Sequence, residues 1–555
     1  MNNESPAYST SSDEGHEKGL RSKSLGLLSS ITIGVSSTAP GYSLAATLGF
    51  IVYAVAYQSP AIILLAFLPI LFIAYAYREL NRETPDCGTT FTWATRVFNP
   101  WVGWMGGWGL VAAGMISMAS VAQIAGKYFF LMLGKGFTWH TTVLGKHFIL
   151  VFGSSLANST LWVTAAGCSW VILLSWVSYR GINVSARLQQ WLLGIEMVVL
   201  IWFSVVALVK VYTGHAGKAA VKPALSWFNP FAVTDGHGFS FSALSAGLLL
   251  AVFLYWGWDT TVSLNEETDE PDKVPGRAAL ISTLILLITY ALVAVACLAY
   301  ASAKPLENSE DVLAQIGGQV LGTHLDKFLI FAVLTSAAAT TQTTIMPNAR
   351  TLLSMGAYDA IPRRFAKIHQ RYLTPGFATF VTAGISIAFY AGLTAISENV
   401  LGDATEVVGL LVAFYYGLTG FSAAWHFRTN AGSSLRQISA RVIMPLIGGI
   451  ALLGVFVKTT VDDFNPDSSY TVVSVFGLRM GGIFVIAVGS LLLGVILMLI
   501  MSRISPAFFA GKTLNRHTPI IVAEHVYAAS ERFGVPDATI DENTVLPPDF
   551  EPLNP

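Results

Sequence analysis

The sequence predicts an all-α integral membrane protein with twelve membrane-spanning helices, and two observations lead to this prediction. First, 53% of the 555 residues are hydrophobic and only 12% are charged, which is about half the charge of a soluble domain. Second, the apolar residues gather into blocks of about 20, the length that crosses a ~30 Å hydrocarbon core. A soluble helical bundle would not be expected to repeat so regular a hydropathy pattern.

The apolar blocks give the order of the expected helices along the chain. They are expected at residues 26-53, 60-80, 102-133, 158-178, 186-212, 241-265, 279-302, 324-347, 376-395, 405-426, 442-460 and 480-502.

The polar ends of the chain predict two tails and an orientation. Residues 1-24 lack the apolar region of a cleavable signal peptide, so we expect a disordered tail there. Residues 503-555 end in an acidic, proline-rich stretch without a core and are expected to form a second tail. Arg479 is the single arginine in a predicted outward segment. Both tails are therefore expected in the cytoplasm, as in a multi-pass protein of a bacterial-type plasma membrane.

Composition also argues against several partners. The net charge of −1 gives no reason to expect a nucleic-acid partner. The three cysteines, Cys87, Cys168 and Cys297, are far apart, so neither a disulfide framework nor a zinc site is predicted. We expect no metal and no cofactor, and the oligomeric state stays open.

Two of the predicted helices contain breaks. The first reads GVSSTAPGYS, where Pro40 removes a backbone donor and Gly41 weakens the helix. The sixth reads FLYWGWDTT, with Gly257 between bulky aromatic residues. Interrupted segments at corresponding positions of two repeats point to a binding site near the bilayer midplane. We therefore expect one repeat over residues 25-214 and a second over 215-427, followed by two extra helices within 428-502.

Four stretches together resemble one family of membrane proteins. They are YREL with TP, GTTF and GWMGGW (residues 77-108), FLYWGWDTT with NEE and PGRA (253-278), RTLLSM with the following Asp, Pro, Phe and TP (350-375), and the SSTAPGYS break (36-43). The chain resembles the amino acid–polyamine–organocation family of secondary transporters over about residues 25 to 500. Many members have a Gly-x-Gly type break in the first helix, where this chain has SSTAPG.

The resemblance implies a LeuT-like fold of 5+5 inverted repeats with discontinuous helices 1 and 6. It implies a permease that moves amino acids or related amines by alternating access, with proton symport. An amine or polyamine exchanger and a nutrient sensor without net transport are the alternatives. No HExxH, GxSxG or paired catalytic aspartates occur, so an enzyme is not expected. The partners implied are a small-molecule substrate, protons and the lipid bilayer.

The breaks and their neighbours supply the candidate substrate-binding residues. Phe253 matches the position of a gating aromatic, although a core phenylalanine is the plain alternative. Tyr255, Trp256 and Trp258 cannot all face one cavity, because neighbours on a helix point in different directions. The candidates are Ser36, Ser37, Thr38, Ala39, Gly41, Phe253, Tyr255, Trp256, Gly257, Asp259, Ser336 and Tyr415.

Two acids lie in apolar surroundings and are candidates for proton coupling. A charge at the bilayer centre is costly, so Asp259 should face protein or water and have a role. It could bind a substrate ammonium, carry a proton, or cap the second half-helix. Glu196 lies in LLGIEMVV, where it could carry a proton, make a structural hydrogen bond or bind sodium.

Charged residues near the cytoplasmic ends could form ion pairs that close the inner side. Glu266 and Glu267 are the candidate acids, and Arg78, Arg277 and Arg350 are the candidate bases. The excess of positive charge in cytoplasmic loops explains these arginines about equally well.

Overall fold

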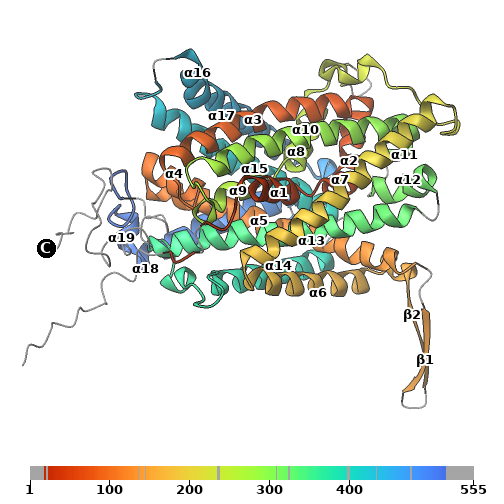
Figure 1. Ribbon diagram of the computed structural model, residues 1–555, viewed down its shortest axis with the longest axis horizontal. Coiled ribbons are helices and arrows are strands. Elements are labelled where there is room, and N and C mark those ends of the chain that lie inside the picture. The colour runs from red at the N-terminus through yellow and green to blue at the C-terminus, as the bar shows by residue number, and fades with distance from the viewer. Residues whose placement is uncertain are drawn as a thin grey trace, which may run out of the picture.

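The computed structural model describes residues 18–519, except for short gaps at 21–22, 135–136, 144–145, 234–237, 308, 310, 323–324, 397–399, 433, 470 and 476–477. Within these residues the chain is mainly helical, and two small β-hairpins are added to it (Figure 1).

The longer helices coincide with the predicted apolar blocks. They are α1 (Leu27–Thr38), α2 (Pro40–Val55), α3 (Ser59–Glu83), α5 (Pro100–Met132), α6 (Thr160–Tyr179), α7 (Ile182–Tyr212), α8 (Phe241–Leu254), α10 (Val274–Ala301), α13 (Asp326–Ala357), α14 (Gly376–Ile396), α15 (Val400–Phe427), α17 (Met444–Asp462) and α18 (Gly482–Ile504). The shorter helices are α4 (Thr90–Val97), α9 (Thr260–Ser263), α11 (Ala303–Leu306), α12 (Val312–Leu321), α16 (Leu435–Ile438) and α19 (Pro506–Phe509).

Ten helical stretches in the described part of the chain are long and apolar enough to cross a membrane. The first of them, Leu27–Glu83, is 57 residues long and includes three helices, α1, α2 and α3. The prediction of a helical membrane protein is thereby confirmed. The count of twelve crossings and the inverted repeat stay predictions.

The helix α5 lies at the centre of the packing. It packs against α13 and α15, and α15 also packs against α17. Glycines allow some of these close approaches, since a Cβ at Gly126 would overlap the Val163 carbonyl oxygen of α6. Small residues at helix contacts are common in membrane proteins, because the hydrophobic effect does not drive helices together inside a bilayer.

The two hairpins were missed by the all-α prediction. β1 (Phe137–Val143) pairs antiparallel with β2 (Lys146–Phe152), and β3 (Val472–Val475) pairs with β4 (Leu478–Gly481). The first hairpin falls between two predicted helices, whereas the second ends inside the predicted helix at residues 480-502. The β1–β2 hairpin projects away from the helices at the lower right of Figure 1. Each strand has seven residues, which is much shorter than the ~20-residue window that detects membrane helices, so hydropathy averaged over that window does not reveal the hairpin.

Candidate functional site

The first break is a single residue between α1 and α2. Ala39 has φ 46°, in the left-handed region, and its N–H donates to the Ser36 carbonyl at 3.1 Å. Pro40 then begins α2 at a position where a helix needs no donor. The Ser43 hydroxyl donates to the Thr38 carbonyl at 2.5 Å. Nearby hydroxyl and amide groups thus satisfy backbone groups that the break releases.

The second break is a five-residue turn from Tyr255 to Asp259, between α8 and α9. Gly257 has φ 122°, a conformation that side chains rarely tolerate. A Cβ placed there would lie 2.6 Å from the Ser37 carbonyl oxygen and 3.0 Å from the Thr38 nitrogen. The glycine therefore permits direct contact between the two breaks, which are more than 200 residues apart in the sequence.

A small cavity, with room for about one water molecule, lies where the two breaks meet. Its walls come from α1, the turn before α9, α5, α13 and α15. The lining residues are Ser37, Leu110, Trp256, Gly257, Asp259, Thr260, Thr343, Thr344, Pro347, Asn348 and Tyr415. Asp259 is the single carboxylate among these residues, and their other polar groups are hydroxyls, an amide and an indole.

Asp259 is 3% exposed and is held by two tyrosines of α15. Tyr415 donates its hydroxyl to Oδ2 at 3.0 Å, and Tyr416 donates to Oδ1 at 2.9 Å. Trp256 donates its indole N–H to the Tyr415 hydroxyl at 2.6 Å. Asp259 stands at the start of α9, but its side chain caps no backbone N–H. The capping alternative is therefore wrong, and the carboxylate keeps acceptor capacity for a ligand that enters the cavity.

Glu196 of α7 is fully buried and meets the start of α2. Its Oε1 accepts the Gly41 N–H at 2.6 Å and the Ser336 hydroxyl at 2.8 Å. The Tyr42 N–H donates to the same Ser336 oxygen at 3.1 Å. Glu196 Oε2 has no hydrogen-bond partner among the described residues. A carboxylate at a helix N-terminus is favoured by the free N–H groups and the helix dipole.

The structure brings only some of the predicted residues to the cavity. Ser37, Trp256, Gly257, Asp259 and Tyr415 line it. The remaining candidates are Ser36, Thr38, Ala39, Gly41, Phe253, Tyr255 and Ser336, and none of them lines it.

Four of these residues have other contacts in the structure. The Gly41 N–H and the Ser336 hydroxyl are engaged with Glu196, so they are not offered to the cavity. Tyr255 points away and donates to the Ile63 carbonyl of α3 at 3.2 Å. Phe253 is 3% exposed and stacks on Trp256 with ring centroids 6.4 Å apart. Its role as a gate stays a prediction.

Sequence reasoning missed the cavity residues of α13 and α5. Thr343, Thr344, Pro347 and Asn348 all belong to α13, and Leu110 belongs to α5. Pro347 inside a long apolar helix was an available signal, because proline removes a helical hydrogen bond. Asn348 and the threonines carry no such signal, since the same residue types also occur in ordinary helix packing.

A second polar cluster, called the inner cluster, contains Lys18, Asp86, Glu266, Glu267 and Arg350. Lys18 Nζ contacts Asp86 Oδ2 at 2.6 Å and Glu266 Oε1 at 2.8 Å. Arg350 holds Glu267 with two hydrogen bonds of 3.0 and 3.1 Å. The predicted ion pairs thus include Arg350 with Glu267. Lys18 was assigned to a disordered tail, whereas it is 3% exposed.

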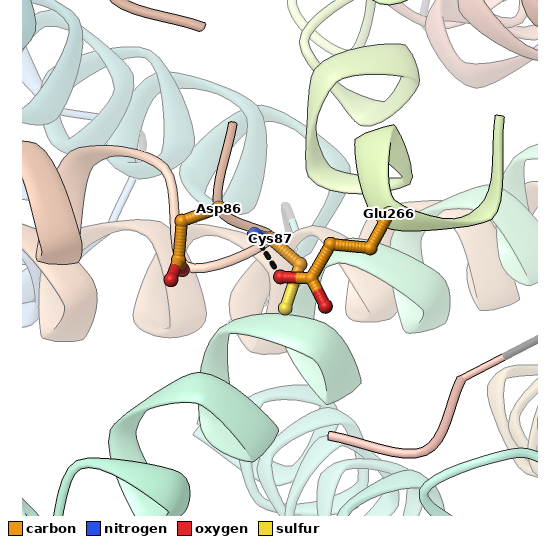
Figure 2. Close-up of side chains that lie close together, drawn as sticks. All are labelled: Asp86, Cys87 and Glu266. Atoms are coloured by element: carbon orange, nitrogen blue, oxygen red, sulfur yellow. Dashed lines mark hydrogen bonds between the residues drawn. The ribbon is translucent and has the colours of Figure 1, made fainter. Parts of the chain in front are cut away.

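Cys87 lies between the two acids that Lys18 contacts (Figure 2). Glu266 Oε1 accepts the Cys87 N–H at 2.9 Å. Asp86, Cys87 and Glu266 are of metal-ligand type and lie close together. The Lys18 ammonium, however, already contacts both carboxylates. Burial also raises the pKa of the Cys87 thiol. The cluster therefore fits an ammonium better than a metal ion.

Asp86 anchors the inner cluster to α13. Its Oδ1 accepts the Ser354 hydroxyl at 2.9 Å, and its Oδ2 accepts the Tyr358 hydroxyl at 2.8 Å. Burial by itself would raise the pKa of Asp86, but the charge of Lys18 and its hydrogen bonds lower that pKa from 3.8 to about 2. Asp86 is therefore ionised at neutral pH.

The sequence belongs to a known family of membrane transport proteins. The amino acid permease family matches residues 25–478, which is most of the chain. The protein is therefore a member of the amino acid permease family, as the resemblance predicted, and its relatives are transporters rather than enzymes.

Named relatives are distant in sequence but cover much of the chain. A branched-chain amino acid permease of Lactococcus lactis subsp. cremoris is 23% identical over 71% of this chain and 80% of its own length. An uncharacterized transporter of Mycobacterium tuberculosis is 26% identical over 66% of this chain and 73% of its own. An arginine/ornithine antiporter of Latilactobacillus sakei is 22% identical over 58% of this chain and 62% of its own length.

Proposed function

We propose that the protein is a secondary active transporter that moves amino acids or related amines across the plasma membrane by alternating access, coupled to proton symport. The observation that supports this best is the contact of two interrupted helices, at Ser37 and Gly257, beside a cavity that contains Asp259. Irregular backbone at membrane depth is tolerated where it lines a cavity or is buried in protein. The pattern is typical of a transporter's substrate site.

The chemistry of the cavity favours a substrate with an ammonium group. Asp259 supplies negative charge and Trp256 supplies an aromatic face, and the described residues that line the cavity include no basic side chain. An ammonium gains from both an ion pair and a cation–π contact. Asn348 and the threonines of α13 offer hydrogen bonds to a carboxylate or another polar group of the substrate. The names of the relatives, which include a branched-chain amino acid permease, agree with this class.

Glu196 is the acid that we assign to proton coupling. Its Oε2 has no hydrogen-bond partner in the described part of the chain, and its Oε1 accepts an N–H of the first turn of α2. Protonation would weaken its hold on the Gly41 N–H, since a neutral carboxyl accepts less strongly than a carboxylate. Proton uptake would thus be coupled to the helix that forms one side of the break. Asp259 is the second candidate for the proton.

Transport by purified protein in liposomes tests the proposal. Uptake of branched-chain amino acids, arginine, ornithine, GABA and diamines would be measured with an inward proton gradient, and again after the gradient is collapsed. Gradient-driven accumulation of one of these is the expected result. Ligand-induced thermal stabilisation without uptake would instead support a nutrient sensor. If none of these compounds is bound or taken up, the proposed substrate class is contradicted.

Exchange is the second candidate mechanism, because one relative is named as an antiporter of arginine and ornithine. It predicts uptake only when the liposomes contain substrate, whether or not a proton gradient is present. The same assay with empty and preloaded liposomes separates exchange from symport.

The proposed topology has twelve crossings, a 5+5 inverted repeat and both termini in the cytoplasm. The distribution of arginines supports it. Reporter fusions after Glu83, Tyr212 and Ser505 would test it. We expect Glu83 and Ser505 to lie inside and Tyr212 to lie outside.

A further inference from the structure

The chain segment before α1 crosses the inner cluster. This N-terminal strap (residues 18–20 and 23–26) ends where α1 begins at Leu27. Lys18 and Leu20 are 3% and 1% exposed. Leu20 packs with Cys87 and with Leu353 of α13. The strap therefore has a fixed place against the helices, which is unusual for a polar segment near a chain terminus.

The strap is joined to the segment after α9 through the backbone. The Ser24 and Leu25 N–H groups both donate to the Glu267 carbonyl, at 2.9 and 3.1 Å. The Asp269 N–H donates to the Leu25 carbonyl at 3.1 Å, and Leu25 forms a parallel bridge with Thr268. The strap is thus attached to the segment that follows the second broken helix.

The ammonium of Lys18 connects that segment to a different part of the molecule. It contacts Glu266, which follows α9, and Asp86, which Ser354 and Tyr358 fix to α13. Its Nζ also lies 5.2 Å from the centre of the Tyr358 ring. One side chain therefore bridges the segment after α9 and the end of the long helix α13.

The two acids need this cation, because they are both fully buried. Removing one partner of a buried ion pair leaves an uncompensated charge in a medium of low dielectric constant. Glu266 Oε2 has no hydrogen-bond partner among the described residues, so this acid depends strongly on Lys18 and the Cys87 N–H. A separation of α9 from α13 would have to break the bridge.

We propose that the N-terminal strap is a lock, in which the Lys18 ammonium bound between Asp86 and Glu266 holds the inner side of the transporter closed. Release of Lys18 is then a required step before the central cavity opens toward the side on which the N-terminus lies. The proposal extends the proposed alternating access, but the contact itself can be tested without a substrate.

Cys87 is a built-in reporter for the strap, because it is fully buried beneath Leu20. Cys297 is equally buried, in α10, and reports global unfolding. In a Cys168→Ser background, N-ethylmaleimide labelling of both cysteines would be followed by mass spectrometry in purified protein. We expect Lys18→Met to accelerate labelling of Cys87 at least ~10-fold and to leave Cys297 unlabelled. Lys18→Arg should keep the wild-type rate.

Two further variants separate a lock from a loss of folding. Lys273→Met removes an exposed lysine whose partner is Glu270, and it should not change the rate. Lys18→Met with Glu266→Gln removes the bridge without leaving Glu266 charged. Labelling of Cys87 in this double variant should stay fast if the Lys18 bridge holds the strap in place. A return to the wild-type rate would overturn the lock. An unchanged rate in Lys18→Met, or equal labelling of Cys87 and Cys297, would overturn it as well.

Discussion

The two helix breaks solve the same backbone problem in different ways. At the first break, one left-handed residue, Ala39, interrupts the helix, and the chain's own Glu196 and Ser336 take the first N–H groups of α2. At the second, a five-residue turn presents Trp256 and Asp259 to the cavity. The first break is internally satisfied, whereas the second keeps an acid whose partners are hydroxyl groups. We infer that the second break recognises the substrate and the first responds to the proton.

The largest expected effect comes from filling the space between the breaks. Gly257→Ala would place a Cβ 2.6 Å from the Ser37 carbonyl oxygen, at a φ of 122°. Strain and overpacking should together destabilise the protein by about 3 kcal/mol or abolish uptake. Thermal unfolding and liposome uptake would measure this. Gly194→Ala, a helix glycine with open space around it, is the control and should change little. Normal transport by Gly257→Ala would contradict the contact.

Asp259→Asn tests the substrate role of the second break. The amide keeps the size but loses the charge, so a charge-assisted contact worth about 1.5–3 kcal/mol is lost. Affinity for an amine-bearing substrate should fall roughly 10- to 100-fold. Thermal shift and uptake would both report the loss. Tyr416→Phe is the matched control, since it removes one hydrogen bond and keeps the charge. If Asp259→Asn binds the substrate with wild-type affinity, the Asp259 charge does not contribute to substrate recognition.

Asp86 extends the comparison to an acid that has a cationic partner. Its pKa lies below that of the unfolded chain, so its ionisation stabilises the folded state at pH values above about 4. A shift from 3.8 to about 2 corresponds to about 2 kcal/mol, which is lost as the pH falls from about 4 to 2. Asp86→Asn should lower the melting temperature at pH 7, and the gap to wild type should narrow toward pH 3. A gap independent of pH would refute the charge as its cause.

Glu196→Gln tests the first break as the proton-responsive one. Glutamine keeps an oxygen that can accept the Gly41 N–H, so the fold should persist. Gradient-driven accumulation should fall about 10-fold, whereas exchange of internal for external substrate should remain, because proton transfer contributes only to the first. Ser336→Ala, which removes a hydrogen bond without removing the acid, should retain the response to the gradient. If Glu196→Gln accumulates substrate as the wild type does, Glu196 is not the acid that couples transport to protons.

The smallest effect is expected at Ala39. A left-handed conformation costs an alanine about 1–2 kcal/mol, which Ala39→Gly would relieve. The substitution also lowers the free energy of unfolding by about 0.4–1 kcal/mol, because glycine gives the unfolded chain more conformational freedom. The net change in the free energy of unfolding should therefore stay within about 1 kcal/mol, with normal uptake. A large loss of uptake would show that the Ala39 methyl group has a role in transport.

Much of the helical architecture was predictable, because each apolar segment carries its own signal. Blocks of about 20 apolar residues place the helices, and Pro40 and Gly257 mark the breaks through the rules of local backbone geometry. The family match confirms the resemblance that these motifs indicated. The two hairpins and the buried strap gave no comparable signal. Short strands and single buried lysines are not distinguished by hydropathy alone.

The sequence by itself determined the membrane class, the positions of the breaks and the acids Asp259 and Glu196. Only the tertiary structure decided which group each acid meets. Tyr416 and Asp259 are 157 residues apart, and Lys18 and Glu266 are 248 apart. Local propensity acts over a few residues, whereas these contacts depend on how whole helices pack. The sequence could therefore locate the charges, but the fold was needed to show that Lys18 bridges two inner acids while Asp259 faces the cavity.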